Sequence, residues 1–190
     1  MSTEERASEQ SSTATGGDGT TRPQGTWEPR HIIFVCWGNI CRSPMAERIA
    51  EKMASDRGLD HLVFSSAATS REEIGHPIDP RARRVLTAAG YRADGHAAHQ
   101  ITSTEIHGAD LVIGMEQLHL DRMRRMAPDA DNFALMTDFD PTAAPGSGID
   151  DPWYGPESGF QVTLTLLERA VSGLLDDIDR GILPAGPRQA

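Results

Sequence analysis

A short apolar segment near the start of the chain constrains the fold more than any other feature. Residues 31–36 read HIIFVC, a run rich in β-branched residues with no polar alternation. Such a run is typical of a strand that is buried on both faces of a parallel sheet. Helix-forming residues follow up to Arg57, with Ser43 suited to the N-cap and Pro44 to the first helical position. The sequence therefore predicts a strand, a tight turn and a helix in direct succession.

The same alternation of strand and helix continues along the chain. Further elements are predicted as strands at 61–67, 109–115 and 132–136, and as helices at 79–89, 116–126 and 157–179. In the last helix apolar residues recur every three or four positions, which marks a buried helix face. A loop rich in Pro, Gly and Asp at 137–151 precedes this helix, and loops of that length are often functional. Alternating strands and helices predict an α/β sandwich with a parallel sheet.

The two ends of the chain differ from its body. The chain has 190 residues, and the first 30 include no Ile, Leu, Val or Phe. Such a segment cannot bury enough apolar area to offset the entropy that ordering costs. We therefore expect a disordered extension at 1–30, one folded domain at 31–182 and a flexible tail at 183–190.

Charge and cysteine content narrow the function. A net charge of −10 argues against nucleic-acid and anionic membrane partners, although a few placed arginines can still bind a phosphorylated substrate. The sequence has no apolar run of about 18 residues, and no apolar core of a signal peptide. The two cysteines, Cys36 and Cys41, are too few for a disulfide scaffold and lack a second pair for a tetrahedral metal site. We expect a cytoplasmic, monomeric protein without a metal or cofactor.

The turn between the first strand and the first helix has the composition of an anion site. Ligands of parallel α/β sheets bind beyond the carboxyl ends of the strands, where this turn lies. Gly38 and Asn39 tolerate positive φ angles, so that successive N–H groups of the loop can point at one anion. The helix N-terminus adds further N–H groups, and Arg42 adds a guanidinium that can bind two phosphate oxygens. The predicted phosphate-binding residues are Trp37, Gly38, Asn39, Ile40, Cys41 and Arg42.

Cys36 at the mouth of this loop suggests nucleophilic catalysis. The positive field of the loop favours a thiolate, the form of cysteine that acts as a nucleophile. A thiolate beside a bound phosphate monoester can attack phosphorus in line, while Arg42 and the backbone hold the equatorial oxygens. The Ser43 hydroxyl can donate to the thiolate and help it to leave in the second step. The competing interpretation is a buried cysteine in an ordinary strand–turn–helix.

A phosphatase of this kind also needs a proton donor for the leaving group. Asp151, followed by Pro152, is the candidate, and Trp153 and Tyr154 could form the walls of a slot for a flat substrate ring. We expect Asp151 to donate a proton first and then to act as a base toward water. Asp150 is the neighbouring rival, and Asp138 and Asp140 are more distant ones. An aspartate that only stabilises a turn is the other interpretation.

The stretch from Phe34 to Glu47 resembles the signature of low-molecular-weight protein tyrosine phosphatases. Matches continue at 66–70, 74–77 and 95–101, and the resemblance covers about His31 to Arg180. It implies a three-layer α/β sandwich with a central four-stranded parallel sheet, the phosphotyrosine protein phosphatase I-like fold. It also implies metal-independent hydrolysis of phosphotyrosine proteins through a phosphocysteine intermediate, with inorganic phosphate as the product. A tyrosine kinase or its targets would be natural partners.

The resemblance also implies roles for single residues. Asp151 stands where the family has its acid, directly before a proline and ahead of the last helix. His96 matches the histidine that supports Asn39, and Cys41 matches a cysteine that protects the nucleophile by a reversible disulfide. For both residues a purely structural role stays open. Trp37 stands where the family often has a smaller residue and is expected to shape the pocket rim. Three further departures are His99, Gly114 and Glu116.

Other activities of the same scaffold remain for comparison. Arsenate reductases coupled to thioredoxin need later cysteines, and this sequence has none after Cys41. Protein arginine phosphatases carry Thr where this chain has Ile40, and an apolar side chain there favours a phenyl ring. A catalytically silent phosphoprotein-binding module could dispense with Cys36 or Asp151, yet both are present.

Overall fold

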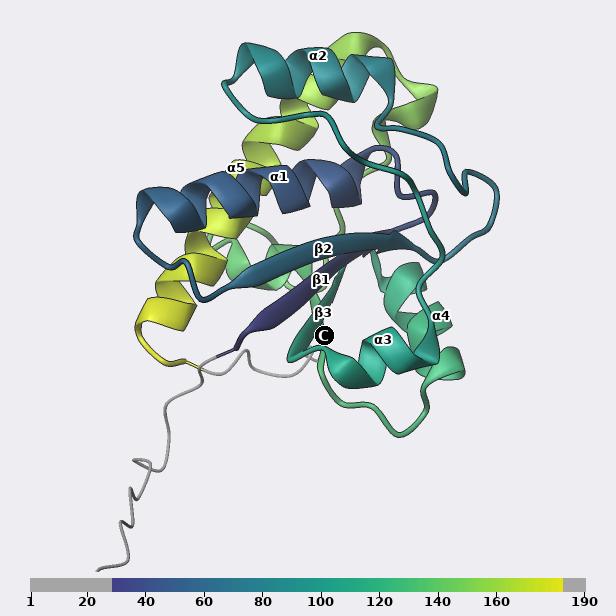
Figure 1. Cartoon of the computed structure of the whole chain (residues 1–190), viewed down its shortest axis with the longest axis vertical. Coiled ribbons are helices and arrows are strands. Elements are labelled where there is room, and N and C mark those ends of the chain that lie inside the picture. Colours follow the sequence, from purple (N-terminus) through teal and green to yellow (C-terminus); the bar gives the residue numbers. More distant parts are fainter. Residues whose placement is uncertain (1–28, 183–190) are drawn as a thin grey trace, which may run out of the picture.

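The computed structural model describes residues 29–182, and Figure 1 shows the chain. Its strands all run parallel in one sheet of order β2-β1-β3-β4, namely β1 (His31–Cys36), β2 (Val63–Ala68), β3 (Leu111–Gly114) and β4 (Phe133–Leu135). The α/β prediction with a four-stranded parallel sheet is confirmed. Residues 1–28 of the predicted extension at 1–30, and the whole of the predicted tail at 183–190, lie outside the described residues.

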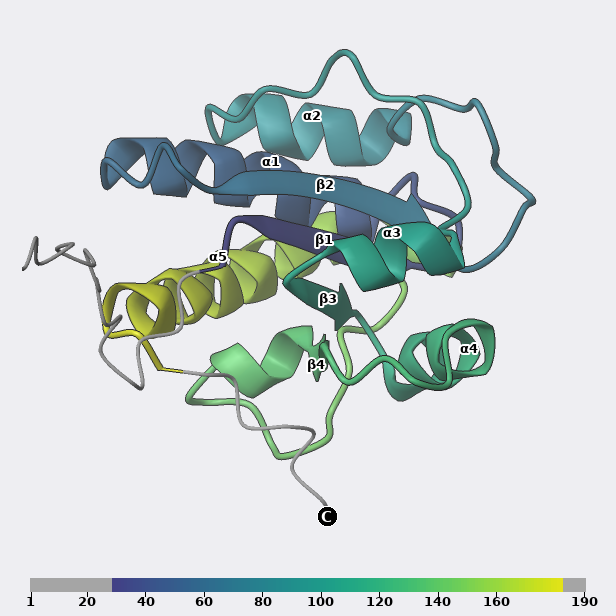
Figure 2. The ribbon, with the colours of Figure 1, turned by 60° about the horizontal axis from the view of Figure 1, so that its bottom comes forward.

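The helices lie on both faces of the sheet and make it the middle of three layers (Figure 2). They are α1 (Arg42–Asp56), α2 (Pro80–Ala88), α3 (Ser103–Gly108), α4 (Gln117–Met126) and α5 (Glu157–Asp179), with single 3-10 turns η1 (Met136–Phe139) and η2 (Pro152–Tyr154). Helices α1, α2 and α5 cover one face, and α3 and α4 cover the other. Each predicted strand and helix is present, with ends that move by at most two residues.

Strand β1 explains why the apolar run constrains the fold. Successive side chains of a strand point to opposite faces. Ile32 and Phe34 accordingly pack with α1 and α5, whereas Ile33 and Val35 pack with α3 and α4. All four side chains are at most 2% exposed, as two covered faces require.

The order of the strands places the loop after β1 at an open edge. The chain moves from β1 to β2 on one side and then returns to β3 on the other side of β1. Loops that leave neighbouring strands in opposite directions open a crevice at their carboxyl ends. The last residue of β1, Cys36, pairs with Ala68 of β2, and Val35 pairs with Gly114 of β3. Three strands therefore end side by side at this crevice.

Two details differ from the sequence prediction. Helix α1 begins at Arg42 with Cys41 at its N-cap position, so Ser43 lies inside the first turn and is not the N-cap. Its hydroxyl group contacts Cys36 Sγ instead. Helix α3 was not predicted because it is short and buries only Ile106. Its available signal was a capping box, in which Thr102 and Glu105 bond each other's backbone N–H groups.

Candidate active site

Asn39 fixes the shape of the loop between β1 and α1. Its φ of 57° is the one positive value for a non-glycine residue within 29–182. The buried side chain compensates for this strain with three hydrogen bonds. Nδ2 donates to Ser43 Oγ at 3.0 Å and to Ser66 Oγ at 2.9 Å, and Oδ1 accepts from the His99 N–H at 3.2 Å. Local and distant parts of the chain thus hold one loop conformation.

Gly38 is needed for space and not for its φ angle. It is absent from the positive-φ glycines of the described chain, which differs from the expectation. A Cβ atom at this position would lie 3.0 Å from Glu73 Cγ. Glycine therefore lets the loop after β2 approach the loop after β1.

His96 contacts the same loop from the protein side. Its Nε2–H donates to the Asn39 carbonyl oxygen at 2.6 Å. Burial lowers the pKa of His96 below its ordinary value, so the ring is neutral at neutral pH. The histidine that the resemblance assigned to loop support is thus placed against Asn39.

Cys36 and Ser43 meet inside the loop. The Cys36 Sγ and Ser43 Oγ atoms are 3.0 Å apart, and both side chains are buried. Asn39 Nδ2 already donates to Ser43 Oγ, so the oxygen has accepted one hydrogen bond and its own proton is free to point at the sulfur. The carbonyl oxygen of Ala67, at 3.3 Å, is a more distant acceptor for that proton.

Cys41, the second cysteine of the loop, lines the same pocket as Cys36. Both are free thiols. Burial and, next, the negative charge of Cys36 raise the pKa of Cys41 well above its ordinary value. Cys41 therefore stays protonated under conditions in which Cys36 would act as the nucleophile.

Arg42 links three parts of the site although its side chain is only 1% exposed. Its Nη1 donates to Glu116 Oε2 at 2.5 Å and to the Ile149 carbonyl at 2.7 Å, and its Nη2 donates to Asp151 Oδ2 at 2.6 Å. Burial alone would lower the pKa of Arg42, but the charges of Cys36 and Asp151 and the Glu116 bond raise it. The buried Nε atom has no hydrogen-bond partner among residues 29–182.

Glu116 is the contact that the sequence interpretation missed. It follows β3 directly and is the N-cap residue of α4, so it lies at the same sheet edge as Cys36. The available signal was a carboxylate immediately after a buried strand, where parallel sheets collect ligand-binding groups. Nothing in the sequence indicated that the Glu116 carboxylate would accept a hydrogen bond from Arg42.

His119 packs behind Glu116 as a neutral, fully buried ring. The Glu116 N–H donates to His119 Nδ1 at 3.0 Å, so the ring proton is on Nε2. That Nε2 lies 4.0 Å from Glu116 Oε2 and has no hydrogen-bond partner in the described chain. Burial, followed by the charges of Arg42 and Arg122, lowers the pKa of His119 to about 3.

This shift predicts a loss of stability in mild acid. The folded pKa of His119 lies below the ordinary value of about 6.5, so the unfolded chain takes up the proton first. The stabilisation is complete above pH 6.5 and is lost as the pH falls toward 3. On account of this residue we expect the free energy of unfolding to fall by about 2 kcal/mol from pH 7 to pH 5. Urea unfolding of wild type and His119→Asn at both pH values measures it, and equal losses in the two proteins would contradict the assignment.

Asp151 serves a turn and the pocket at once. One oxygen, Oδ1, accepts from the Trp153 N–H at 3.1 Å and caps η2, while Oδ2 accepts from Arg42. The same carboxylate therefore makes both a turn contact and a contact with Arg42. Asp150 is exposed and does not line the pocket, and Asp138 and Asp140 bond elsewhere.

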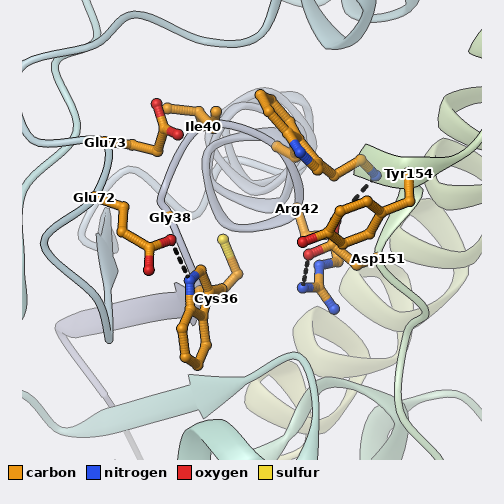
Figure 3. Close-up of a pocket in the computed structure, with 11 residues that line it drawn as sticks. Cys36, Gly38, Ile40, Arg42, Glu72, Glu73, Asp151 and Tyr154 are labelled. Atoms are coloured by element: carbon orange, nitrogen blue, oxygen red, sulfur yellow. Dashed lines mark hydrogen bonds and ion pairs between the residues drawn. The ribbon is translucent and has the colours of Figure 1, made fainter.

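The pocket gathers the predicted residues from separate elements (Figure 3). Cys36 lies at its base, with Asp151 and Tyr154 on one side and Glu72 on the opposite side. Trp37, Ile40 and Trp153 also line it. Trp153 is 40% exposed and Tyr154 is 92% exposed, so the aromatic wall beside Asp151 faces solvent. Glu72 and Glu73 add carboxylates to the rim that the sequence interpretation did not include.

Among residues 29–182, none of the helices combines the length and the apolar character of a membrane-spanning segment. No group of three or more His, Cys, Asp or Glu side chains in that range could hold a metal ion.

Comparison with known proteins gives consistent matches. The family model described as low molecular weight phosphotyrosine protein phosphatase matches residues 31–182. A low molecular weight protein-tyrosine-phosphatase of Streptomyces coelicolor is 42% identical over 149 residues, which cover 76% of this chain and 90% of the relative. A protein tyrosine phosphatase structure from Entamoeba histolytica has a TM-score of 0.75 at 29% identity and covers 80% of this chain and 97% of its own. An arginine phosphatase structure has a TM-score of 0.73 at 24% identity, covering 79% of this chain and 96% of its own, and shares the fold.

Proposed function

The chain belongs to the low molecular weight phosphotyrosine protein phosphatases, and from this premise we propose that its pocket hydrolyses phosphotyrosine through a phosphocysteine on Cys36. Membership makes the protein a cysteine-dependent protein tyrosine phosphatase that needs no metal. One observation carries the residue assignment. The buried Arg42 guanidinium joins Asp151 to a loop in which Cys36 Sγ lies 3.0 Å from a hydroxyl donor.

Phosphate binding would use donors that now lack acceptors. The Arg42 Nε–H is buried without a partner in the described chain, and a phosphate oxygen would supply one. The backbone N–H groups from Trp37 to Arg42, at the N-terminus of α1, would hold the remaining oxygens. A dianion would also compete with Asp151 for Arg42 Nη2. We infer that substrate binding frees Asp151 to carry a proton beside the leaving oxygen.

The reaction then takes two balanced steps. In the first, Cys36 Sγ bonds to phosphorus, the bond from phosphorus to the tyrosine oxygen breaks, and Asp151 gives its proton to that oxygen. In the second, Asp151 takes a proton from water, the water oxygen bonds to phosphorus, and the P–S bond breaks to release inorganic phosphate. Ser43 Oγ–H stabilises the departing thiolate, and Arg42 holds the equatorial oxygens in both steps.

Substitution of Asp151 tests the proton transfer. We expect Asp151→Ala to lower kcat by about 10²–10⁴ on phosphotyrosine, the typical range for a general acid. The loss in kcat/KM, which reports the first step, should be smaller for p-nitrophenyl phosphate than for phosphotyrosine, because its leaving group needs less protonation. The matched control is Asp150→Ala, which removes the neighbouring carboxylate outside the pocket and should keep full turnover. Equal kcat values for Asp151→Ala and wild type on phosphotyrosine would show that Asp151 is not the proton donor.

Phosphoarginine is the alternative substrate. Ile40 lines the pocket and offers an apolar surface without a hydroxyl group, which suits a phenyl ring better than a guanidinium. We expect kcat/KM for a phosphotyrosine peptide to exceed that for the matched phosphoarginine peptide at least tenfold, roughly the discrimination that such a pocket can supply. A higher kcat/KM for the phosphoarginine peptide would identify the protein as an arginine phosphatase.

We also propose that the protein acts as a cytoplasmic monomer on phosphotyrosine proteins, among them a tyrosine kinase or its targets. The two free thiols, one of them the nucleophile, suit a reducing compartment. Cys41 would protect Cys36 by forming a disulfide after oxidation of the thiolate. A substrate-trapping variant with Asp151→Ala, used in a phosphoproteomic comparison with wild type, would identify the protein substrates.

A further inference from the structure

The indole ring of Trp37 is held by two residues that the reaction does not use. Its Nε1–H donates to Glu72 Oε2 at 2.8 Å, and the guanidinium carbon of Arg122 lies 4.4 Å from the ring centroid. Glu72 belongs to the loop after β2 and Arg122 to α4, so the two contacts come from separate elements. Within residues 29–182 no carboxylate pairs with Arg122, so the Trp37 ring is the group that stabilises its charge.

The loop that carries Glu72 is itself fixed to the catalytic loop. The Thr69 N–H donates to the Cys36 carbonyl at 2.9 Å, and the Ser70 N–H donates to the Trp37 carbonyl at 3.0 Å. The tight approach of Glu73 to Gly38 closes the same junction. Glu72 is therefore placed by backbone contacts, and its carboxylate is a fixed acceptor for the indole.

Trp37 and Tyr154, two aromatic side chains of the pocket, differ in how firmly they are held. Figure 3 shows Glu72, with its bond to Trp37, across Cys36 from Tyr154. The Tyr154 hydroxyl has no hydrogen bond in the described chain, and the side chain is almost fully exposed. A substrate ring that enters the pocket meets the held indole of Trp37 and the free phenol ring of Tyr154; Trp153, beside Tyr154, is contacted by Arg81. Packing on the held indole costs no rotamer entropy on the protein side.

We propose that Glu72 and Arg122 are positioning residues that hold Trp37 as the fixed wall of an aromatic slot and so favour aryl over alkyl phosphate monoesters. The proposal rests on the proposed function, because it concerns the same pocket. An aromatic pair adds a modest affinity beyond its buried area, and a mobile indole would lose much of that gain.

Two ligands distinguish binding in the aromatic slot from binding in the phosphate loop. Inorganic phosphate occupies the loop alone, and phenylphosphonate adds a ring that cannot be hydrolysed away. Calorimetric titration of both ligands into the full chain should show that Glu72→Ala binds phenylphosphonate roughly threefold to tenfold more weakly. Its affinity for phosphate should equal that of wild type, and turnover of p-nitrophenyl phosphate should show a raised KM with an unchanged kcat.

Two further variants separate position from charge. Glu72→Gln keeps an oxygen that can accept the indole N–H and should restore phenylphosphonate binding. Glu73→Gln removes a charge from the same rim without touching Trp37 and should keep the wild-type ratio of the two affinities. An unchanged phenylphosphonate affinity in Glu72→Ala, an equal loss for both ligands, or the same loss in either glutamine variant would overturn the proposal. Because the titrations need no turnover, an inactive wild type would overturn the proposed function alone.

Discussion

The Cys36→Ser variant is expected to lose turnover of phosphotyrosine by a factor on the order of 10⁴ or more, as removal of a catalytic nucleophile does elsewhere. The substitution keeps a small polar atom beside Ser43 Oγ, 3.0 Å from the present sulfur, and changes little else. A serine hydroxyl is almost never ionised at neutral pH, so it cannot replace a thiolate as a nucleophile. Steady-state rates with phosphotyrosine and p-nitrophenyl phosphate measure the loss.

Binding distinguishes a chemical defect from a folding defect in that variant. The loop donors and Arg42 do not depend on the sulfur for their geometry, so inorganic phosphate should still bind to Cys36→Ser. Wild-type turnover should be inhibited by vanadate and unaffected by EDTA, because the pocket supplies its own positive charge through Arg42 and α1. A Cys36→Ser variant that binds phosphate and retains wild-type turnover would exclude Cys36 as the nucleophile.

The Arg42→Lys variant should lose about 10²–10³ in kcat, the range measured when one donor to a transition-state anion is removed. The planar guanidinium serves Glu116, Ile149 and Asp151 from fixed directions and still has Nε–H to offer. A lysine ammonium keeps the charge but has no planar fork and cannot satisfy the same set. The variant therefore tests directional hydrogen bonding and not charge.

Arg48 provides the matched control on the same helix. It is also buried, at 4% exposure, and it pairs with Glu47 and Glu51, neither of which lines the pocket. Glu47 reaches the loop only indirectly, through Ser66 and Asn39. Arg48→Lys should lower the free energy of unfolding by about 1–2 kcal/mol, because buried charged hydrogen bonds are lost, and leave kcat unchanged. If both variants reduced kcat equally, the effect would belong to the helix and not to the site.

The sequence was most informative where one segment carries its own signal. The apolar run at 31–36 predicted β1 with its bounds, and the three-and-four spacing of apolar residues predicted α5 with its bounds. The predicted start of α1 was wrong. Ser43 has a side chain suited to an N-cap, but its hydroxyl group contacts Cys36 and Asn39 instead. At this position the contacts within the loop outweigh the preference of serine for the N-cap. Helix α3 lacked the periodic apolar face that reveals longer helices.

The contacts of the site depend on pairs that are distant in sequence. Arg42 is 74 residues from Glu116 and 109 from Asp151, and no spacing rule links such positions. The motif identified Cys36 and Arg42, and the resemblance favoured Asp151 over Asp150. It did not indicate that Asp151 would be bonded to Arg42, or that Glu72 would bond Trp37. Those facts follow from strand order and loop docking, which only the fold supplies.

The most direct test of the central claim is the identification of the phosphorylated atom during turnover. Wild type and Asp151→Ala would be quenched in acid within the first turnovers of p-nitrophenyl phosphate, digested and analysed by mass spectrometry. The account predicts one phosphoryl group on the peptide that contains Cys36, with more of it in Asp151→Ala, because hydrolysis of the intermediate lacks its base. Phosphate released with no adduct on Cys36 in either protein, or an adduct on another residue, would contradict it.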